Sequence, residues 1–186
     1  ISIDTQKPGV ARAAIEAGAV LVNDIAANRA DGAMWKVVAE TGAGYVAMHM
    51  RGTPATMQDD PRYEDVAGEI GEFFRERLET LGAFGVGREH VALDPGVGFG
   101  KTLEQNVELL THLKEFMRFD RPVVLGVSRK SFLGGLTGAG VQERMPAGLA
   151  CCVWGAMCGV RIVRTHDVAP TVQALRVTEA ISARAT

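Results

Sequence analysis

The stretch VALDPGVGFGKT, Val91–Thr102, decides the fold class of this 186-residue chain. Its first three residues are apolar, Asp94 follows them, and a loop with three glycines comes next. A continuous apolar run is typical of a strand that is buried on both faces. Glycines in the following loop allow a bound molecule to approach the main chain closely. The stretch therefore predicts a buried strand that presents a carboxylate beside a ligand-binding loop.

The same pattern recurs along the chain, where short apolar runs alternate with helical segments. Proline near the start of a segment and glycine just past its end are typical helix boundaries. Strands are expected at Ile1–Thr5, Val20–Ile25, Tyr45–Met50, Val91–Asp94, Val123–Val127 and Ile162–Thr165. Helices are expected at Pro8–Ala17, Asp31–Thr41, Val66–Leu81, Leu103–Phe116, Met145–Gly159 and Thr171–Ala183. This alternation predicts an α/β protein with a parallel sheet.

Polar residues follow nearly every expected strand, not only those at one switch point of an open sheet. That distribution favours a (β/α)8 TIM barrel, in which all the βα loops surround one site, over a doubly wound sheet. A complete barrel takes about 250 residues, so the chain is expected to supply about six βα units, as a partial barrel. No change of composition marks a linker, so residues 1–186 are expected to form a single domain. Because the chain starts at Ile1, in the middle of the pattern, we expect this domain to be N-terminally incomplete.

Composition narrows the classes of function. The net charge of −2 gives non-specific nucleic-acid binding no electrostatic support. No apolar run approaches the roughly 20 residues of a membrane span, and the first residues resemble a strand rather than a signal peptide. Cys151, Cys152 and Cys158 lie in one apolar segment without the spacing of a zinc site. We therefore expect a cytoplasmic protein with reduced thiols that binds neither nucleic acid nor membrane.

Polar residues at the expected strand ends point to the kind of ligand. Asp4, Asn23 and Asp94 would meet at the barrel mouth, where they suit a neutral ring with several N–H donors. Lys130 and Arg164 would offset the carboxylates and donate to ring oxygens or to an anion. His166 lies two residues beyond Arg164, and this pair suits a diphosphate. His49 and Arg51 flank another strand end and are weaker ligand candidates.

The glycine loop comes close to two nucleotide-binding motifs but matches neither. A P-loop requires glycine where Pro95 stands, although the loop ends in the Gly-Lys-Thr of that motif. The dinucleotide-binding motif requires its third glycine where Lys101 stands. Nucleotide binding is therefore a distant alternative.

Six segments, in this order and spacing, closely resemble the dihydropteroate synthase family: ISIDT, VNDI, MHMRGTPATMQ, LDPGVGFGKT, GVSRKSF and VRTHDV. The resemblance implies a (β/α)8 barrel transferase of folate biosynthesis. It would condense 6-hydroxymethyl-7,8-dihydropterin diphosphate with p-aminobenzoate, with Mg²⁺, to give 7,8-dihydropteroate and pyrophosphate. Diphosphate would leave first, and the arylamine would then capture the cation-like pterin methylene group.

The resemblance also implies roles for individual residues. Those expected to bind the pterin are Asp4, Asn23, Met48, Asp94, Gly126 and Lys130. Those expected at the p-aminobenzoate side are Phe99, Lys130 and Ser131. Arg164 and His166 would bind the diphosphate, and Lys130, Arg164 and His166 would be catalytic. Family members have two earlier loops, one with an asparagine near the metal and one with a threonine–arginine pair near p-aminobenzoate, so no metal ligand is expected in this chain.

Two other functions remain open. A pterin-binding barrel of the methyltransferase type also presents a carboxylate and an asparagine to a folate, but it needs no diphosphate site. A non-catalytic pterin-binding fragment is the second alternative.

The segment 145–160 predicts an assembly. It has no charged residue, although an outer barrel helix should have one polar face. Trp154 and Met157 cannot both face the strands together with Leu149, Cys152 and Val153. We therefore expect a homodimer through this region, as the resemblance also implies, unless a neighbouring helix or an earlier part of the chain covers the same face.

Overall fold

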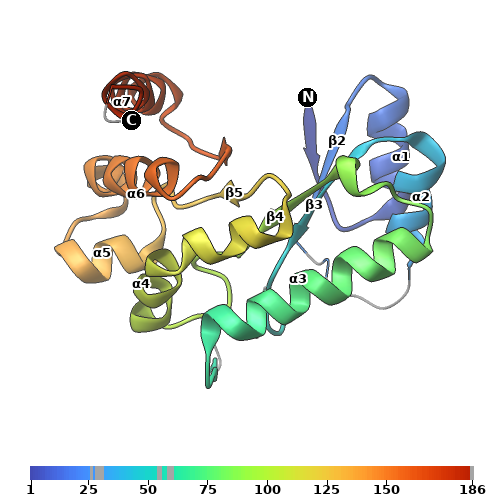
Figure 1. The fold of residues 1–186 in the computed structure, drawn as a ribbon, viewed down its shortest axis with the longest axis horizontal. Helices are drawn as coiled ribbons and strands as arrows, with labels where there is room; N and C mark the ends of the chain where they lie inside the picture. Colours follow the sequence, from blue (N-terminus) through green and yellow to red (C-terminus); the bar gives the residue numbers. More distant parts are fainter. Residues whose placement is uncertain (26, 28–31, 54–55, 58–60, 185–186) are drawn as a thin grey trace.

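The computed structural model describes residues 1–25, 27, 32–53, 56–57 and 61–184. Within them all strand pairs are parallel, and the strands follow one another in chain order (Figure 1). One sheet contains β1 (Ser2–Asp4), β2 (Leu21–Asp24), β3 (Gly44–Met48) and β4 (Val91–Asp94). A second sheet pairs β5 (Val124–Leu125) with β6 (Ile162–Val163), and a parallel bridge between Leu93 and Val123 joins the two sheets. This arrangement is the expected partial wall of a βα barrel.

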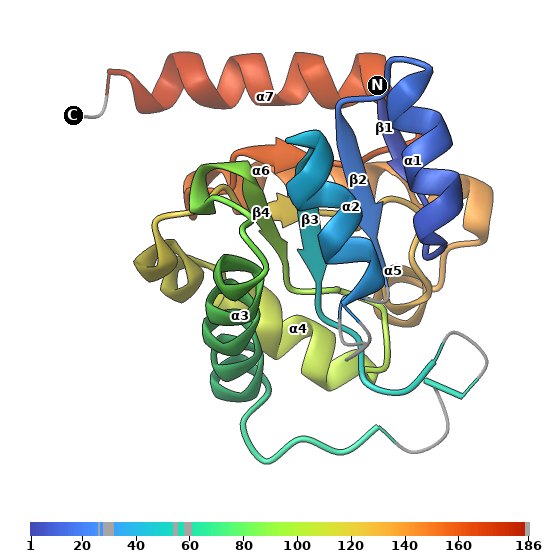
Figure 2. The ribbon, with the colours of Figure 1, turned by 90° about the vertical axis from the view of Figure 1, so that its right-hand side faces the viewer.

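Helices cover the outer side of this wall (Figures 1 and 2). They are α1 (Pro8–Glu16), α2 (Ala33–Thr41), α3 (Val66–Ala83), α4 (Leu103–Thr111), α5 (Ser131–Thr137), α6 (Met145–Met157) and α7 (Val168–Ser182), with 3-10 turns at Arg88–His90, Leu113–Phe119 and Val141–Glu143. Local signals set several starts: Pro8 occupies the first turn of α1, and Asp65 caps α3 by accepting from Gly68 N. Thr102 and Gln105 form a capping box at α4. In the described part of the chain, no helix is both long and apolar enough to cross a membrane.

The structure differs from the expected elements at several places, among them the end of α4, the helix α5 and the start of α7, which begins at Val168 rather than Thr171. The helix expected at 103–116 ends at Thr111, and a 3-10 turn follows it. Helix α5 was not expected, because Gly134 and Gly135 lower helix propensity. A Cβ atom at either glycine would lie within 3 Å of Arg144 or Leu103, so close packing explains the glycines. Asp31, the expected start of α2, lies outside the described residues, as do residues 54–55 and 58–60 of the loop before α3.

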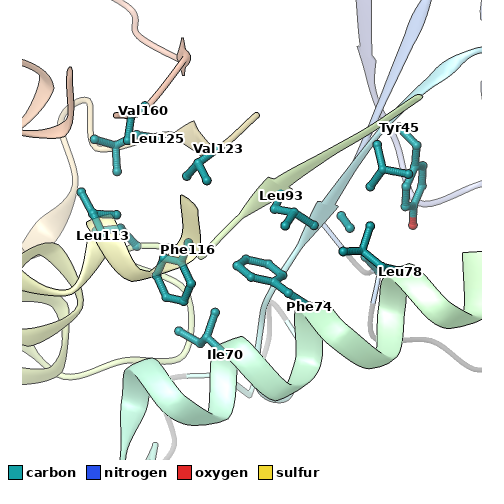
Figure 3. Packing of buried hydrophobic residues seen from close by; sticks show 14 of the residues in the cluster. Tyr45, Ile70, Phe74, Leu78, Leu93, Leu113, Phe116, Val123, Leu125 and Val160 are labelled. Carbon is teal, nitrogen blue, oxygen red and sulfur yellow. The ribbon is translucent and has the colours of Figure 1, made fainter. Parts of the chain in front are cut away.

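The main core lies between the strands and the helices. Ile70 and Phe74 of α3 point toward Leu93 of β4 and Phe116, as Figure 3 shows. A smaller cluster contains Val46, Ala92 and Val124, with Leu21 packed against it. Residues that pair across parallel strands share a face, and Val46 pairs with Ala92 on one side and with Asn23 on the other. Polar Asn23 therefore shares a face with this smaller apolar cluster.

Candidate active site

Strand register gathers the predicted side chains on one face of the wall. Asp4 of β1 pairs with Asn23 of β2, which in turn pairs with Val46 of β3. Met48, two residues after Val46 on β3, pairs with Asp94 of β4. Because side chains alternate between faces, both rows lie on the same face, at the carboxyl ends of the strands. That end is where parallel barrels place their sites.

A cavity of about 640 Å³ opens at this end of the strands. Its volume is in the range of small-molecule sites, about 300–1,000 Å³. The predicted residues that line it are Asp4, Asn23, Met48, Asp94, Phe99, Gly126, Lys130, Arg164 and His166. Ser131 is not among the lining residues: it is exposed and begins α5, directly after Lys130. The structure thus brings together every predicted site residue except Ser131.

Asp94 is a buried carboxylate with one free edge. Its Oδ1 accepts from Gly96 N at 2.8 Å, and Oδ2 has no hydrogen bond within the described chain. Burial raises the pKa of Asp94, although the Gly96 N–H and the cations Lys130, Lys101 and Arg164 oppose that rise. A carboxylate in this setting is suited to two parallel N–H donors of a ligand.

Asn23 presents a second acceptor to the cavity. Its Nδ2 donates to Asp4 Oδ1 at 2.9 Å, which fixes the orientation of the amide. Its Oδ1 is buried and has no hydrogen-bond partner among the described residues. A buried acceptor without a partner is costly, so this oxygen is suited to accept from a bound molecule.

Lys130 lines the cavity and contacts the glycine loop. Its Nζ donates to Val97 O at 2.6 Å and lies 3.7 Å from the centroid of the Phe99 ring. Burial lowers the pKa of Lys130 to about 8; Asp94 opposes this shift and Arg164 adds to it. At neutral pH the group is still mostly a cation, and its contacts to the loop orient it.

Arg164 and His166 form the rim of the cavity. Arg164 Nη2 donates to Asp4 Oδ2 at 2.6 Å, and His166 Nδ1 lies 2.9 Å from Ser128 Oγ. The Arg164 side chain is about half exposed, 55%, so it remains available to an anion at the mouth. The rim can therefore stabilise negative charge that develops on a leaving group.

Several lining residues were not predicted from the sequence. The β1–α1 segment contributes Thr5, Gln6, Lys7 and Val10, and Ser128 orients His166. Their positions just after the expected strands could have indicated them. Their residue types could not, because such side chains are also common in loops without a binding role. The remaining unpredicted lining residue is Ile25, which directly follows β2.

The weaker candidates His49 and Arg51 lie outside this cavity. They line a more open hollow of about 1,340 Å³ beside α3, together with charged residues of that helix. Burial lowers the pKa of His49 well below its usual value, and the cations Lys101 and Arg51 add to this effect. Burial and the two neighbouring cations therefore favour the neutral form of His49.

Metal binding was also assessed from side-chain geometry. In the part of the chain that the structure describes, no group of three or more His, Cys, Asp or Glu side chains is arranged to hold a metal ion.

Comparison with known proteins extends these findings. The profile of the family described as "Pterin binding enzyme" matches residues 1–166. The chain is 46% identical over 180 residues to a dihydropteroate synthase of Escherichia coli, covering 97% of this chain and 64% of that protein. A dihydropteroate synthase of Neisseria meningitidis serogroup B is 39% identical, with 97% and 65% covered. The chain thus spans a little less than two thirds of the length of these curated relatives.

Solved structures agree with the sequence relatives. A crystal structure of Yersinia pestis dihydropteroate synthase with a sulfonamide drug complex superposes with a TM-score of 0.95 at 41% identity, covering 98% of this chain and 66% of that chain. A Xanthomonas albilineans dihydropteroate synthase in complex with 7,8-dihydropteroate gives a TM-score of 0.89 at 40% identity, covering 98% and 68%. At such identity the superposition confirms the expected barrel fold.

Proposed function

Because the chain belongs to the pterin binding enzyme family, we propose that it forms the substrate site of a dihydropteroate synthase. The reaction condenses 6-hydroxymethyl-7,8-dihydropterin diphosphate with p-aminobenzoate to give 7,8-dihydropteroate and pyrophosphate. The relatives named dihydropteroate synthase support this proposal, as does the structure of one of them with 7,8-dihydropteroate.

One observation carries the proposal: two residues that line the same cavity each have a side-chain oxygen with no hydrogen bond among the described residues. Asn23 Oδ1 is buried with no partner among the described residues, and Asp94 Oδ2 likewise has none. A pterin ring has an amidine edge with adjacent N–H groups, which are the donors that these acceptors require. Lys130, which also lines the cavity, is the complementary donor for the ring oxygen.

The rim residues are proposed to assist the departure of diphosphate. The bond between the pterin methylene carbon and the diphosphate oxygen breaks, and its electron pair stays on oxygen. Arg164 and His166 stabilise that growing negative charge. The amine nitrogen of p-aminobenzoate then bonds to the methylene carbon and loses one proton, for which no strong base is required because an arylamine is already a nucleophile.

The p-aminobenzoate side is proposed at Phe99, Lys130 and Ser131. The Phe99 ring and the Lys130 ammonium form one edge of the cavity. Ser131 has no place in the lining, so its role depends on a loop arrangement other than the one described.

Mg²⁺ is proposed as an ion that accompanies the diphosphate. It would offset part of the diphosphate charge when bound. The described residues form no metal site, so this chain's own contribution to the departing anion rests on Arg164 and His166.

A second candidate function is pterin binding without turnover. Ser131, expected at the p-aminobenzoate side, lies outside the cavity lining. A methyltransferase-type barrel is less well supported, because it has no need for the Arg164 and His166 rim.

We further propose a cytoplasmic homodimer. Cys151, Cys152 and Cys158 are all free thiols, which agrees with a reducing compartment. On α6, Trp154 and Met157 are 46% and 67% exposed, which leaves an apolar face for a second copy to cover.

Two measurements test the function. Calorimetry with a 6-hydroxymethylpterin should show one binding site on the chain, and Asp94→Ala should abolish it. The protein, incubated with the pterin diphosphate and p-aminobenzoate, should release pyrophosphate and form 7,8-dihydropteroate. Pterin binding without product would favour the non-catalytic alternative, and no pterin binding by the unchanged chain would overturn the proposal.

A further inference from the structure

Lys101 is a buried lysine that the proposed reaction does not use. The residue is only 3% exposed and does not line the cavity. Its Nζ donates to Gly96 O and to Phe99 O, both at 3.0 Å, and lies 3.3 Å from His49 Nδ1. Buried lysines are rare, and this one has a partner for each of its three ammonium hydrogens.

The loop that Lys101 holds has little rigidity of its own. Gly96, Gly98 and Gly100 all have positive φ, at 67°, 81° and 59°. Such glycines leave the unbound main chain many alternatives. A Cβ atom at Gly96 would lie 1.9 Å from His49 O, so the loop is packed directly against the end of β3.

The same loop orients Lys130. Val97 O accepts from Lys130 Nζ at 2.6 Å, and the Phe99 ring lies 3.7 Å from that nitrogen. Lys101 donates to the carbonyls of Gly96, which precedes Val97, and of Phe99, whose ring contacts Lys130. Lys101 therefore anchors the loop on the side away from the cavity, and Lys130 contacts the loop on the cavity side.

We propose that Lys101 is a positioning residue that fixes the Phe99 ring and the Val97 carbonyl against Lys130, and so shapes the arylamine side of the cavity. This inference rests on the proposed function for the identity of that ligand. Lys101 is not a catalytic residue in this view, because it acts only through the loop.

The anchoring works in either charge state of Lys101. As an ammonium ion it donates its third hydrogen to His49 Nδ1, and as a neutral amine it still donates to both carbonyls and can accept from Nδ1–H. Burial lowers the pKa of Lys101 to about 7; Asp94 opposes this shift, and Lys130 and Arg51 add to it. A neutral residue of similar length, such as methionine, therefore fits the site without a charge to desolvate.

The direct test is the environment of Lys130 in the ligand-free chain. The ε-methylene protons of Lys130 lie beside the face of Phe99, so their NMR signals should be shifted upfield by the ring and can be assigned with Lys130→Gln. Lys101→Met should move these signals toward the ordinary lysine position. Lys36→Met, on the exposed side of α2, should leave them unchanged.

Ligand affinity gives a second readout. Lys101→Met should raise the dissociation constant of p-aminobenzoate, measured with pterin and pyrophosphate present, by about tenfold, the worth of a desolvated cation–π contact. The dissociation constant of the pterin alone should change by less than about threefold. An equal loss for both ligands would mean a general structural role and overturn the inference.

The two readouts separate this inference from the proposed function. If the unchanged chain bound no pterin, the proposed function would fail, while the NMR comparison would still decide whether Lys101 orients Lys130. If Lys101→Met folded with unshifted Lys130 signals, the inference would fail whatever the ligand. Should Lys101→Met not fold, His49→Leu removes one anchor only, and it should shift the same signals partway; no shift would overturn the inference.

Discussion

Arg164 and Asp4, which are 160 residues apart in sequence, form an ion pair of 2.6 Å across the mouth of the cavity. Asp4 ends β1 and Arg164 follows β6, the two strands at opposite ends of the strand order. The same carboxylate accepts from Asn23 Nδ2 at 2.9 Å. Asp4 therefore couples the residue proposed to bind the pterin with the residue proposed to bind the diphosphate.

Asp4→Asn should change anion binding more than stability. Both side chains are about half exposed, so the ion pair contributes at most about 1 kcal/mol to folding. Without the carboxylate, Arg164 is free to bind pyrophosphate, and we expect its affinity to rise by about fivefold in low salt. Urea unfolding and pyrophosphate calorimetry measure the two effects. Glu40→Gln, which removes the similarly exposed Arg12–Glu40 pair, is the control and should leave pyrophosphate affinity unchanged.

Asp94→Asn should weaken pterin binding and, at neutral pH, stabilise the folded chain relative to the unchanged protein. An amide oxygen still accepts from Gly96 N, but it no longer offers a charged acceptor, so pterin affinity should fall by about 2–5 kcal/mol. Because burial raises the pKa of Asp94, the folded state holds its proton more tightly than the unfolded state. The free energy of unfolding of the unchanged chain should therefore decline relative to the variant as pH rises above about 4. Urea unfolding of both proteins at several pH values between about 4 and about 7 measures this decline. A difference in the free energy of unfolding that stays constant with pH would contradict the prediction.

The sequence predicted the strand-end residues well, because buried strands leave few positions for polar groups. Asp4, Asn23 and Asp94 are polar residues at the ends of apolar runs, and the parallel register then brings them together. Lys101 was passed over as part of an incomplete P-loop, since a lysine in a loop is normally exposed. Its burial depends on His49, which is 52 residues away in sequence, and on loop carbonyls, which no side-chain pattern reveals.

Helix α5 and Ser131 show a second limit of the sequence. No helix was expected at α5, and its two glycines are required by contacts with Leu103 and Arg144 from other elements. Where α5 begins sets where Ser131 lies, and the helix start keeps Ser131 outside the cavity lining. Tertiary packing, not local propensity, decided both features.

Lys101→Met should alter how stability depends on pH. The pKa of Lys101 is about 7 in the folded state, mainly because of burial, against about 10.4 for an unfolded lysine. Between these values the unfolded state binds more protons, so the unchanged chain should gain stability as pH rises from about 7 to about 10. The variant lacks this gain, and the difference between the two should change by more than about 1 kcal/mol over that range. Parallel slopes for both proteins in chemical denaturation would contradict the prediction, and Lys36→Met controls for the loss of an exposed lysine.

Arg129 combines backbone strain with an ion pair. Its φ is 60°, rare for a residue with a Cβ atom, and its Nη2 donates to Asp167 Oδ1 at 2.7 Å. Arg129→Gln loses the ion pair and keeps the strain, whereas Arg129→Gly loses both. We therefore expect Arg129→Gly to have the higher urea midpoint of the two. The reverse order would show that the left-handed backbone at this position carries no cost.

The apolar face of α6 predicts a concentration-dependent dimer. Met157 is 67% exposed, and Trp154 Nε1 donates to Leu110 O at 2.8 Å, which holds the indole in place with its ring partly exposed. Val177 and Ile181 of α7, which packs against α6, are also exposed, and a stable interface needs about 800 Å² from each copy. Met157→Asp places a charge in this surface and should convert a dimer into a monomer in sedimentation velocity. Val20→Asp, before β2, adds the same charge at an equally exposed position and should leave the dimer intact. A chain that sediments as a monomer before any substitution would mean that this face is covered by something other than a second copy.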